Sequence, residues 1–366
     1  MRGRFDVESI AAAFAEAAFD STKWPTAMDH VAQATQSYGA VLLPVRGRLP
    51  NIPFSLSMGE SVESYLKDGW VERDERYLAT PIIAQRGVAT ESDFITTDAM
   101  ARHPYYQDFL ARFGLRWFAG VKVACGDDFW CCSIQRTIQQ GPFSPDELDQ
   151  LAKLSSRLSS SAALARAVGF ARVEAALDAF EISGEAVVML DRCGDVLRLN
   201  SLAEQLLGLD LHINRRRLVS FDRDATAALD RTLHVALWSE TNGGLLAPIV
   251  LPRLEGRPIL AYVSRPTGIA FDVMSPCQFV VVLVDLDARV EIAESELTQV
   301  FGLTPAEARF AGRFLRHESL EGAAKAQGIT YESARNILKK ILSKTGTHRQ
   351  ADLASLLAQF SKRGRG

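Results

Sequence analysis

The residues between Thr330 and Arg349 carry side chains that could do chemistry on a nucleic acid. If 330–344 is helical, one face is apolar and the opposite face carries arginine, asparagine and lysine. Arginine and asparagine can make paired hydrogen bonds to the edges of guanine and adenine, and lysine can reach guanine or a phosphate. The pattern predicts a helix that reads DNA. The alternative is a solvated basic helix in an ordinary four-helix bundle. The candidate contacts are Thr330, Tyr331, Ser333, Arg335, Asn336, Lys339, Lys340, Lys344 and Arg349.

Helix-start and helix-stop signals surround this segment and predict the elements that position it. Thr304 is followed by a proline and by Glu307, which is the pattern of a capping box. Small polar residues or glycines stand at the other expected boundaries. The expected caps are Thr304, Ser319, Thr330 and Thr347, with Gly328 and Gly346 as stops. A short helix, a glycine turn and a longer basic helix predict a helix-turn-helix.

The segment 303–360 resembles the C-terminal DNA-binding domain of LuxR-type transcriptional regulators. The resemblance implies that Arg335, Asn336 and Lys339 read bases, and that Lys340, Lys344 and Arg349 lie near phosphates. The sequence departs from the family pattern at His317, Gln327, Ala334 and Ile337. A helix-turn-helix that has lost DNA binding and serves protein interactions therefore stays open as the alternative. The matching residues are Leu303-Thr304-Pro305-Ala306-Glu307, Ser319, Ala324, Gly328-Ile329-Thr330, Lys344-Thr345-Gly346 and Arg349-Gln350-Ala351-Asp352-Leu353.

The resemblance also implies partners. Double-stranded operator DNA is the first, and RNA polymerase is a further one. Helix-turn-helix proteins commonly bind two half-sites as dimers, so a homodimer on a two-fold operator is expected.

Length and charge agree with a sensor joined to a DNA reader. A chain of 366 residues predicts two or three domains. From residue 301 onward 12 Lys and Arg stand against 5 Asp and Glu, a net charge of +7, which leaves −10 for the first 300 residues. A basic segment of this kind suits contact with nucleic acid. The longest apolar strand-like run is far shorter than a membrane span, so a cytoplasmic protein without membrane contact is expected.

The N-terminal part, 1–143, is expected to be an α/β sensor domain rich in aromatic residues. Aromatic side chains with polar tips often line small-molecule cavities, although they also fill cores. The order of elements resembles the GAF-like, autoinducer-binding type of domain that precedes LuxR-type readers. The acyl-homoserine-lactone signature is incomplete, because no Asp-Pro pair follows Tyr65 and Trp70, so the ligand stays open. The candidate ligand-binding residues are Tyr65, Trp70, Asp74 and Trp117.

A long helix is predicted over 144–182. Ser144, a proline and Glu147 form a capping box, and leucines and small residues follow at 3–4 spacing. The spacing favours a linking and dimerisation helix over one that lies back on its own domain. The predicted seam is Leu151, Leu154, Leu158, Ser161, Ala165 and Val168.

The next part, 183–290, resembles a PAS domain. Strands are expected at 185–191, 196–200, 247–251, 260–264 and 279–286, with helices at 201–207 and 225–238. The resemblance leaves open a flavin, a haem, a small metabolite or no ligand. No flavin-adduct cysteine motif is visible. His212 and His234 could be haem ligands, but a lone histidine is more often a structural or exposed residue. No cofactor is therefore predicted.

No catalytic or metal-binding pattern stands out in the sequence. There is no nucleophile elbow, phosphate-binding loop, dinucleotide fingerprint or zinc-protease helix. The 5 cysteines lack metal-site spacing, and Cys131-Cys132 is read as part of a strand, with a redox switch as the alternative. An enzyme is not expected, although an unfamiliar pocket in the aromatic domain remains the alternative. The predicted fold is multidomain α+β, with a GAF-like sensor (1–143), a linking helix (144–182), a PAS-like module (183–290) and an all-α four-helix helix-turn-helix domain (296–366).

Overall fold

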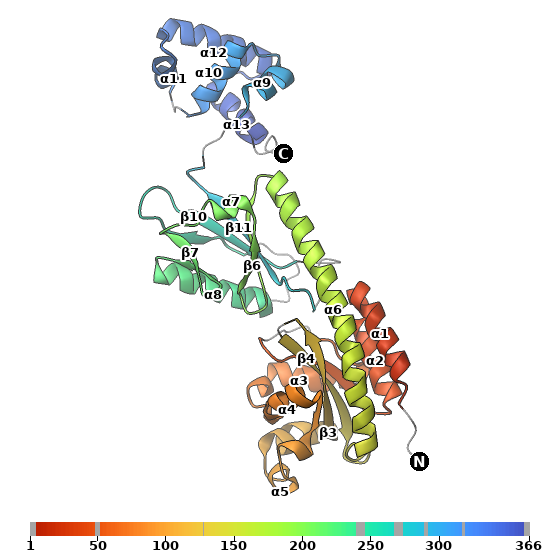
Figure 1. The fold of residues 1–366 in the computed structure, drawn as a ribbon. Coiled ribbons are helices and arrows are strands. Elements are labelled where there is room, and N and C mark those ends of the chain that lie inside the picture. Colours follow the sequence, from red (N-terminus) through yellow and green to blue (C-terminus); the bar gives the residue numbers. More distant parts are fainter. Residues whose placement is uncertain are drawn as a thin grey trace.

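The structure is a computed structural model that describes residues 5–47, 52–126, 128–238, 246–266, 274–288, 292–316 and 319–361. The chain is mixed α/β, with antiparallel sheets followed by a helical C-terminal region (Figure 1). The helices are α1 Val7–Phe19, α2 Trp24–Ala34, α3 Gly59–Lys67, α4 Thr80–Arg86, α5 Thr97–Met100, α6 Pro145–Ile182, α7 Ser201–Glu204, α8 Arg223–Trp238, α9 Glu294–Phe301, α10 Pro305–Arg316, α11 Leu320–Gln327, α12 Tyr331–Thr345 and α13 Gln350–Ser361. The strands are β1 Gly39–Pro44, β2 Val88–Thr90, β3 Leu115–Cys125, β4 Asp128–Thr137, β5 Ala186–Leu190, β6 Val196–Leu199, β7 Leu211–Asn214, β8 Arg217–Ser220, β9 Ile249–Leu251, β10 Ile259–Ser264 and β11 Phe279–Asp285.

The N-terminal sheet has the order β1-β4-β3-β2 and separates two layers. Successive residues of a strand point to opposite faces. On one face Leu42, Cys132 and Ile134 are buried in the core that the apolar sides of α1, α2 and α6 complete. On the other face β1 and β4 pair Val41 with Ser133 and Leu43 with Cys131, and these residues line a cavity. The alternation thus assigns one face to the core and one to a candidate site.

Helix α6 begins at the predicted capping box, where Ser144 and Glu147 exchange hydrogen bonds. The seam residues Leu151, Leu154 and Leu158 are fully buried within this one chain, where α6 packs on β3 and α1. Two serines explain the polar positions beside that seam. The Ser155 hydroxyl donates to the Lys122 carbonyl at 2.7 Å, and Ser159 accepts from the Ala124 amide at 2.8 Å.

The seam is therefore not available to a second chain, contrary to the dimer that its spacing favours. The C-terminal half of α6 continues beside the middle sheet (Figure 1). There Val173 and Leu177 pack with Val187 and Met189 of β5. One helix thus contacts both α/β units.

The middle unit is a five-stranded antiparallel sheet in the order β6-β5-β11-β10-β9, with α7 and α8 beside it. Asn200 ties its first strands together, because its side chain accepts from the Val187 amide and donates to the Glu185 carbonyl. The expected strands and helices are present with shifted ends. The hairpin β7–β8 was not predicted as strands. Its turn holds Arg215 and Arg216 at positive φ, and β8 begins at Arg217.

The C-terminal helices α9–α13 enclose a separate apolar core. The predicted caps at Thr304, Ser319 and Thr330 are formed. The cap predicted at Thr347 is wrong, because α13 begins only at Gln350 and the Thr347 hydroxyl lies 2.9 Å from that of Thr345. Residues 289–291 of the preceding linker and the departure at His317 lie outside the described residues. None of the helices in the described part of the chain is long and apolar enough to cross a membrane.

Candidate functional site

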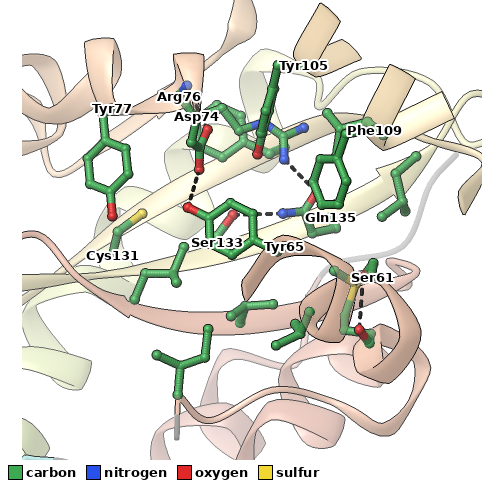
Figure 2. Close-up of a pocket in the computed structure, with 18 of the residues that line it drawn as sticks. Ser61, Tyr65, Asp74, Arg76, Tyr77, Tyr105, Phe109, Cys131, Ser133 and Gln135 are labelled. Carbon is green, nitrogen blue, oxygen red and sulfur yellow. Dashed lines mark hydrogen bonds between the residues drawn. The ribbon is translucent and has the colours of Figure 1, made fainter. Parts of the chain in front are cut away.

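A cavity lies between the N-terminal sheet and the segments that follow β1 (Figure 2). Its volume is about 60 Å³. This is several times the roughly 10–15 Å³ that a single water needs, so the space suits a small organic molecule. Most of the wall is apolar, with a polar edge formed by Ser61, Tyr65, Asp74, Arg76, Tyr105, Ser133 and Gln135.

Asp74 and Tyr65 form one side of the polar edge. Asp74 caps the short 3₁₀ helix Glu75–Ala79, where its Oδ1 accepts from the Arg76 amide at 2.9 Å. The hydroxyl of Tyr65, on α3, donates to Asp74 Oδ2 at 2.8 Å. Burial raises the pKa of Asp74 above its ordinary value, although the Arg76 charge and the Tyr65 hydrogen bond oppose the shift. Asp74 is therefore a poorly solvated acceptor at the cavity wall.

The guanidinium of Arg76 forms the floor behind this pair and is almost fully buried. Its Nη2 donates to Glu91 Oε1 at 2.8 Å, and its Nη1 donates to Gln135 Oε1 at 2.7 Å. The group also lies over the ring of Phe118 at 4.6 Å. Burial is the largest influence and lowers the pKa of Arg76, but the Glu91 carboxylate, together with Tyr105, Tyr106 and Asp74, outweighs it and raises the pKa above its ordinary range. The arginine therefore stays charged and is held by the protein's own groups.

Tyr105 and Phe109 come from a π-helix, Tyr105–Phe109, and also line the cavity (Figure 2). On β4, the Gln135 amide donates to the Ser133 hydroxyl at 3.1 Å, which orients both groups at the wall. Such a wall can bind a small, largely apolar molecule and fix its direction through a few hydrogen bonds.

The cavity contains two of the four predicted ligand-binding residues, Tyr65 and Asp74. Trp70 does not line it and instead stacks on Phe109, with ring centroids 5.4 Å apart. Trp117 does not line it either. It follows an irregularity in β3 and carries Arg116 over its ring at 5.3 Å.

The sequence interpretation missed Arg76 and Gln135 as cavity residues. The hydrogen-bond partner of Arg76, Gln135, is 59 residues away in the sequence, so no local pattern indicates the pair. Cys131 also lines the cavity, where burial raises the pKa of its thiol to about 12. A thiol that stays protonated at neutral pH is a poor nucleophile, which disfavours the redox switch.

Helix α12 presents a basic face to solvent. Ala334, Leu338 and Ile341 are buried in the C-terminal core, while Ile337 and Leu342 are partly buried against it. The Thr330 hydroxyl accepts from the Ser333 amide at 3.2 Å and fixes the start of the helix beside the Gly328 turn. All the predicted contacts are exposed, namely Thr330, Tyr331, Ser333, Arg335, Asn336, Lys339, Lys340, Lys344 and Arg349.

Lys344 differs from the other basic residues of α12 because its ammonium is engaged within the domain. It donates to Glu307 Oε2 at 2.6 Å and to the Gly302 carbonyl at 3.0 Å. The hydrogen bond from Lys344, together with those from the Thr304 backbone and hydroxyl, lowers the pKa of Glu307. Lys344 therefore joins α12 to the start of α10, a structural role that the sequence resemblance did not imply.

The histidines considered as haem ligands lie on different elements, His212 on β7 and His234 on α8. Among the described residues, no group of three or more His, Cys, Asp and Glu side chains is placed to hold a metal ion.

No protein-family model matches the chain, and no curated protein is significantly similar to it. Among solved structures, the VqsR LBD domain from Pseudomonas aeruginosa aligns over 43% of this chain and 94% of its own, with 14% identity and a TM-score of 0.32. The Vibrio cholera VqmA–ligand–DNA complex aligns over 49% of this chain and 84% of its own, with 15% identity and a TM-score of 0.21. The E. coli DhaR(N)–DhaL complex aligns over 76% and 87%, with 10% identity and a TM-score of 0.26. Likenesses this weak carry no argument about function.

Proposed function

We propose that this chain is a DNA-binding transcriptional regulator of the LuxR type. In this proposal 296–366 is the helix-turn-helix domain, and α12 enters the major groove. The sensor 1–143 and the PAS-like unit 183–290, joined by the helix 144–182, control it. The chain acts as a homodimer in the cytoplasm.

The observation that carries the proposal is the division of α12 into two faces. Its apolar residues complete the core, so the helix is rigidly mounted, while Arg335, Asn336 and Lys339 project into solvent. Exposed arginine and asparagine on a mounted helix are suited to base edges, and Lys340 and Arg349 to phosphates. The capped short helix α11 and the Gly328 turn before α12 support the helix-turn-helix reading.

The cavity supplies the proposed signal input. Its apolar wall and its polar edge around Tyr65, Asp74 and Gln135 suit a small, largely apolar molecule with a hydrogen-bond donor for Asp74. Mass spectrometry of the purified chain under non-denaturing conditions tests this input. A retained small molecule, or a thermal shift against a metabolite library, supports it. An unliganded mass together with no thermal shift counts against it.

DNA binding is tested by selecting duplexes from a random pool with the full-length chain and measuring their affinity by gel shift. Arg335→Ala and Lys339→Ala should each weaken binding to the selected duplex by about 1–3 kcal/mol, as expected for base-contacting side chains. Lys153→Ala, which removes an exposed positive charge from α6, is the matched control and should bind normally.

The alternative function is a protein-interaction module whose helix-turn-helix no longer binds DNA. Gln327 is the feature that favours it, because its side-chain oxygen is buried without a hydrogen-bond partner at the end of α11. Failure of the full-length chain to enrich any duplex, with its helices intact by circular dichroism, would favour this alternative.

A further inference from the structure

The ligand cavity adjoins the boundary between the two α/β units. A second, smaller cavity shares part of its wall with the first, through residues of β1, α3 and the segments nearby. The shared lining residues are Leu43, Pro44, Ile52, Tyr65 and Tyr77. Among the lining residues of the described chain, Trp238 alone comes from the middle unit, at the end of α8. Trp238 therefore faces the side of the N-terminal unit on which Tyr65 and Tyr77 border the ligand cavity. Figure 2 shows these two tyrosines at that cavity.

Direct contacts hold the two units together beside this point. The Arg192 Nε, in the turn between β5 and β6, donates to the Arg46 carbonyl at 2.6 Å. Its guanidinium lies over the ring of Trp130 at 5.4 Å. Gly47 has a φ of 74°, and a Cβ there would lie 3.1 Å from the Cys193 sulfur. The chain after β1 thus passes close against the first hairpin of the middle unit.

We propose that the ligand site is built by both units, with Trp238 of the middle unit closing the cavity of the N-terminal unit. This inference rests on the sensor role in the proposed function and adds the residue that closes the site. A ligand in the cavity would contact Tyr65 and Tyr77, which line the second cavity together with Trp238. The binding free energy of the ligand therefore includes the free energy of docking the two units. Ligand binding stabilises the docked arrangement, and docking strengthens ligand binding.

The same arrangement gives a route from ligand to DNA reader that does not need a new ligand site in the middle unit. Trp238 ends α8, which packs on β9 and β10 of the middle sheet. The chain leaves that sheet at Asp285, the end of β11, on its way to α9. Displacement of Trp238 by an ill-fitting molecule would loosen the docking that sets the position of this sheet relative to the N-terminal unit.

Cys131 provides a test that needs no knowledge of the ligand. Cys131, on β4, lines the ligand cavity. Its partner residue on the neighbouring strand β1 is Leu43, which lines both cavities. The full-length chain is treated with methyl methanethiolsulfonate at mildly alkaline pH, and modification of Cys131 is followed by peptide-resolved mass spectrometry. Cys132, fully buried on the other face of β4, is the internal control for global unfolding.

Trp238→Ala should speed modification of Cys131 by about tenfold, because truncating a packed aromatic contact shifts a local closing equilibrium by at least that factor. Arg192→Ala, which loosens the docking without touching either cavity wall, should act in the same direction. Trp117→Ala, a tryptophan outside both cavities, should leave the rate unchanged.

Unchanged Cys131 rates in both Trp238→Ala and Arg192→Ala overturn the inference. Equal acceleration of Cys131 and Cys132 in both variants also overturns it, because that result reports unfolding rather than opening. Neither result depends on DNA binding, which the gel shift measures separately. Failure of the two-unit site can therefore be distinguished from failure of the proposed function.

Discussion

Arginines play opposite roles at the two ends of this molecule. Arg76 in the N-terminal unit is buried and gives its donors to Glu91, Gln135 and the Arg116 carbonyl. Arg335 on α12 is exposed. A buried guanidinium of this kind gives most of its donors to the protein's own groups and serves to hold the cavity wall. An exposed one on a rigid helix keeps its donors for another molecule. Burial thus distinguishes an arginine that supports the wall of a site, such as Arg76, from an arginine that is available to contact a partner, such as Arg335.

The largest effect expected from this comparison is loss of stability in Arg76→Ala. Removing the guanidinium leaves the Glu91 carboxylate buried without its partner, which costs about 3–5 kcal/mol. Urea unfolding followed by tryptophan fluorescence measures it. The matched control is Arg86→Ala, whose ion pair with Asp93 is partly exposed and is worth about 0–1 kcal/mol. Equal costs for the two variants would remove the distinction between buried and exposed arginines.

A similar loss is expected from Leu158→Ala in α6, because Leu158 is fully buried against the N-terminal unit. Truncating a buried leucine costs about 2–5 kcal/mol. Leu164→Ala is the control on the same helix, since Leu164 is 39% exposed and its truncation should cost less than about 0.5 kcal/mol. Unfolding should be measured at several protein concentrations. A Leu158→Ala effect that depends on concentration would mean that the seam packs against a second chain after all.

The smallest effect concerns Glu307, whose pKa is lowered from 4.5 mainly by the hydrogen bond from Lys344. A depressed carboxyl pKa stabilises the fold fully above the ordinary value, and this contribution is lost as the pH falls through the folded-state pKa. Protection of α10 and α12 from hydrogen exchange should therefore decrease on acidification below about pH 4.5 in the native chain. Glu307→Gln keeps a capping side chain and should show a weaker pH dependence.

Glu294→Gln serves as the control for that experiment, because Glu294 forms only an exposed pair with Arg309 at 3.4 Å. Its pH dependence should match that of the native chain. If Glu307→Gln also matches the native chain, Lys344 does not hold α12 to α10 in the way that the hydrogen bonds indicate.

The parts of the structure that could be predicted are those fixed by neighbours in the sequence. Each cap at Thr304, Ser319 and Thr330 joins groups three residues apart, so the sequence carries the signal directly. Tyr65 and Asp74, nine residues apart, were also found. The Thr347 cap failed, although its pattern is equally local. There a neighbouring hydroxyl on Thr345 lies within hydrogen-bonding distance of that threonine.

The parts that could not be predicted depend on distant partners. Arg76 donates a hydrogen bond to Gln135, which is 59 residues away in the sequence, and no local pattern predicts that pair. The leucine seam of α6 has the same spacing whether its partner is β3 or a second chain, so its pattern could not choose between them. Aromatic composition pointed to Trp70 and Trp117, but composition does not say which side of a strand or turn a ring faces.

The central claim is that α12 reads base sequence through its exposed face. The most direct test is the ratio of affinities for the selected duplex and for a scrambled duplex of the same composition, at one fixed salt concentration. Arg335→Ala should reduce the difference in binding free energy between the two duplexes by about 1–3 kcal/mol, which lowers the ratio. The affinity for scrambled DNA should stay nearly unchanged. A variant that loses both affinities equally, or keeps the native ratio, would contradict sequence reading by α12.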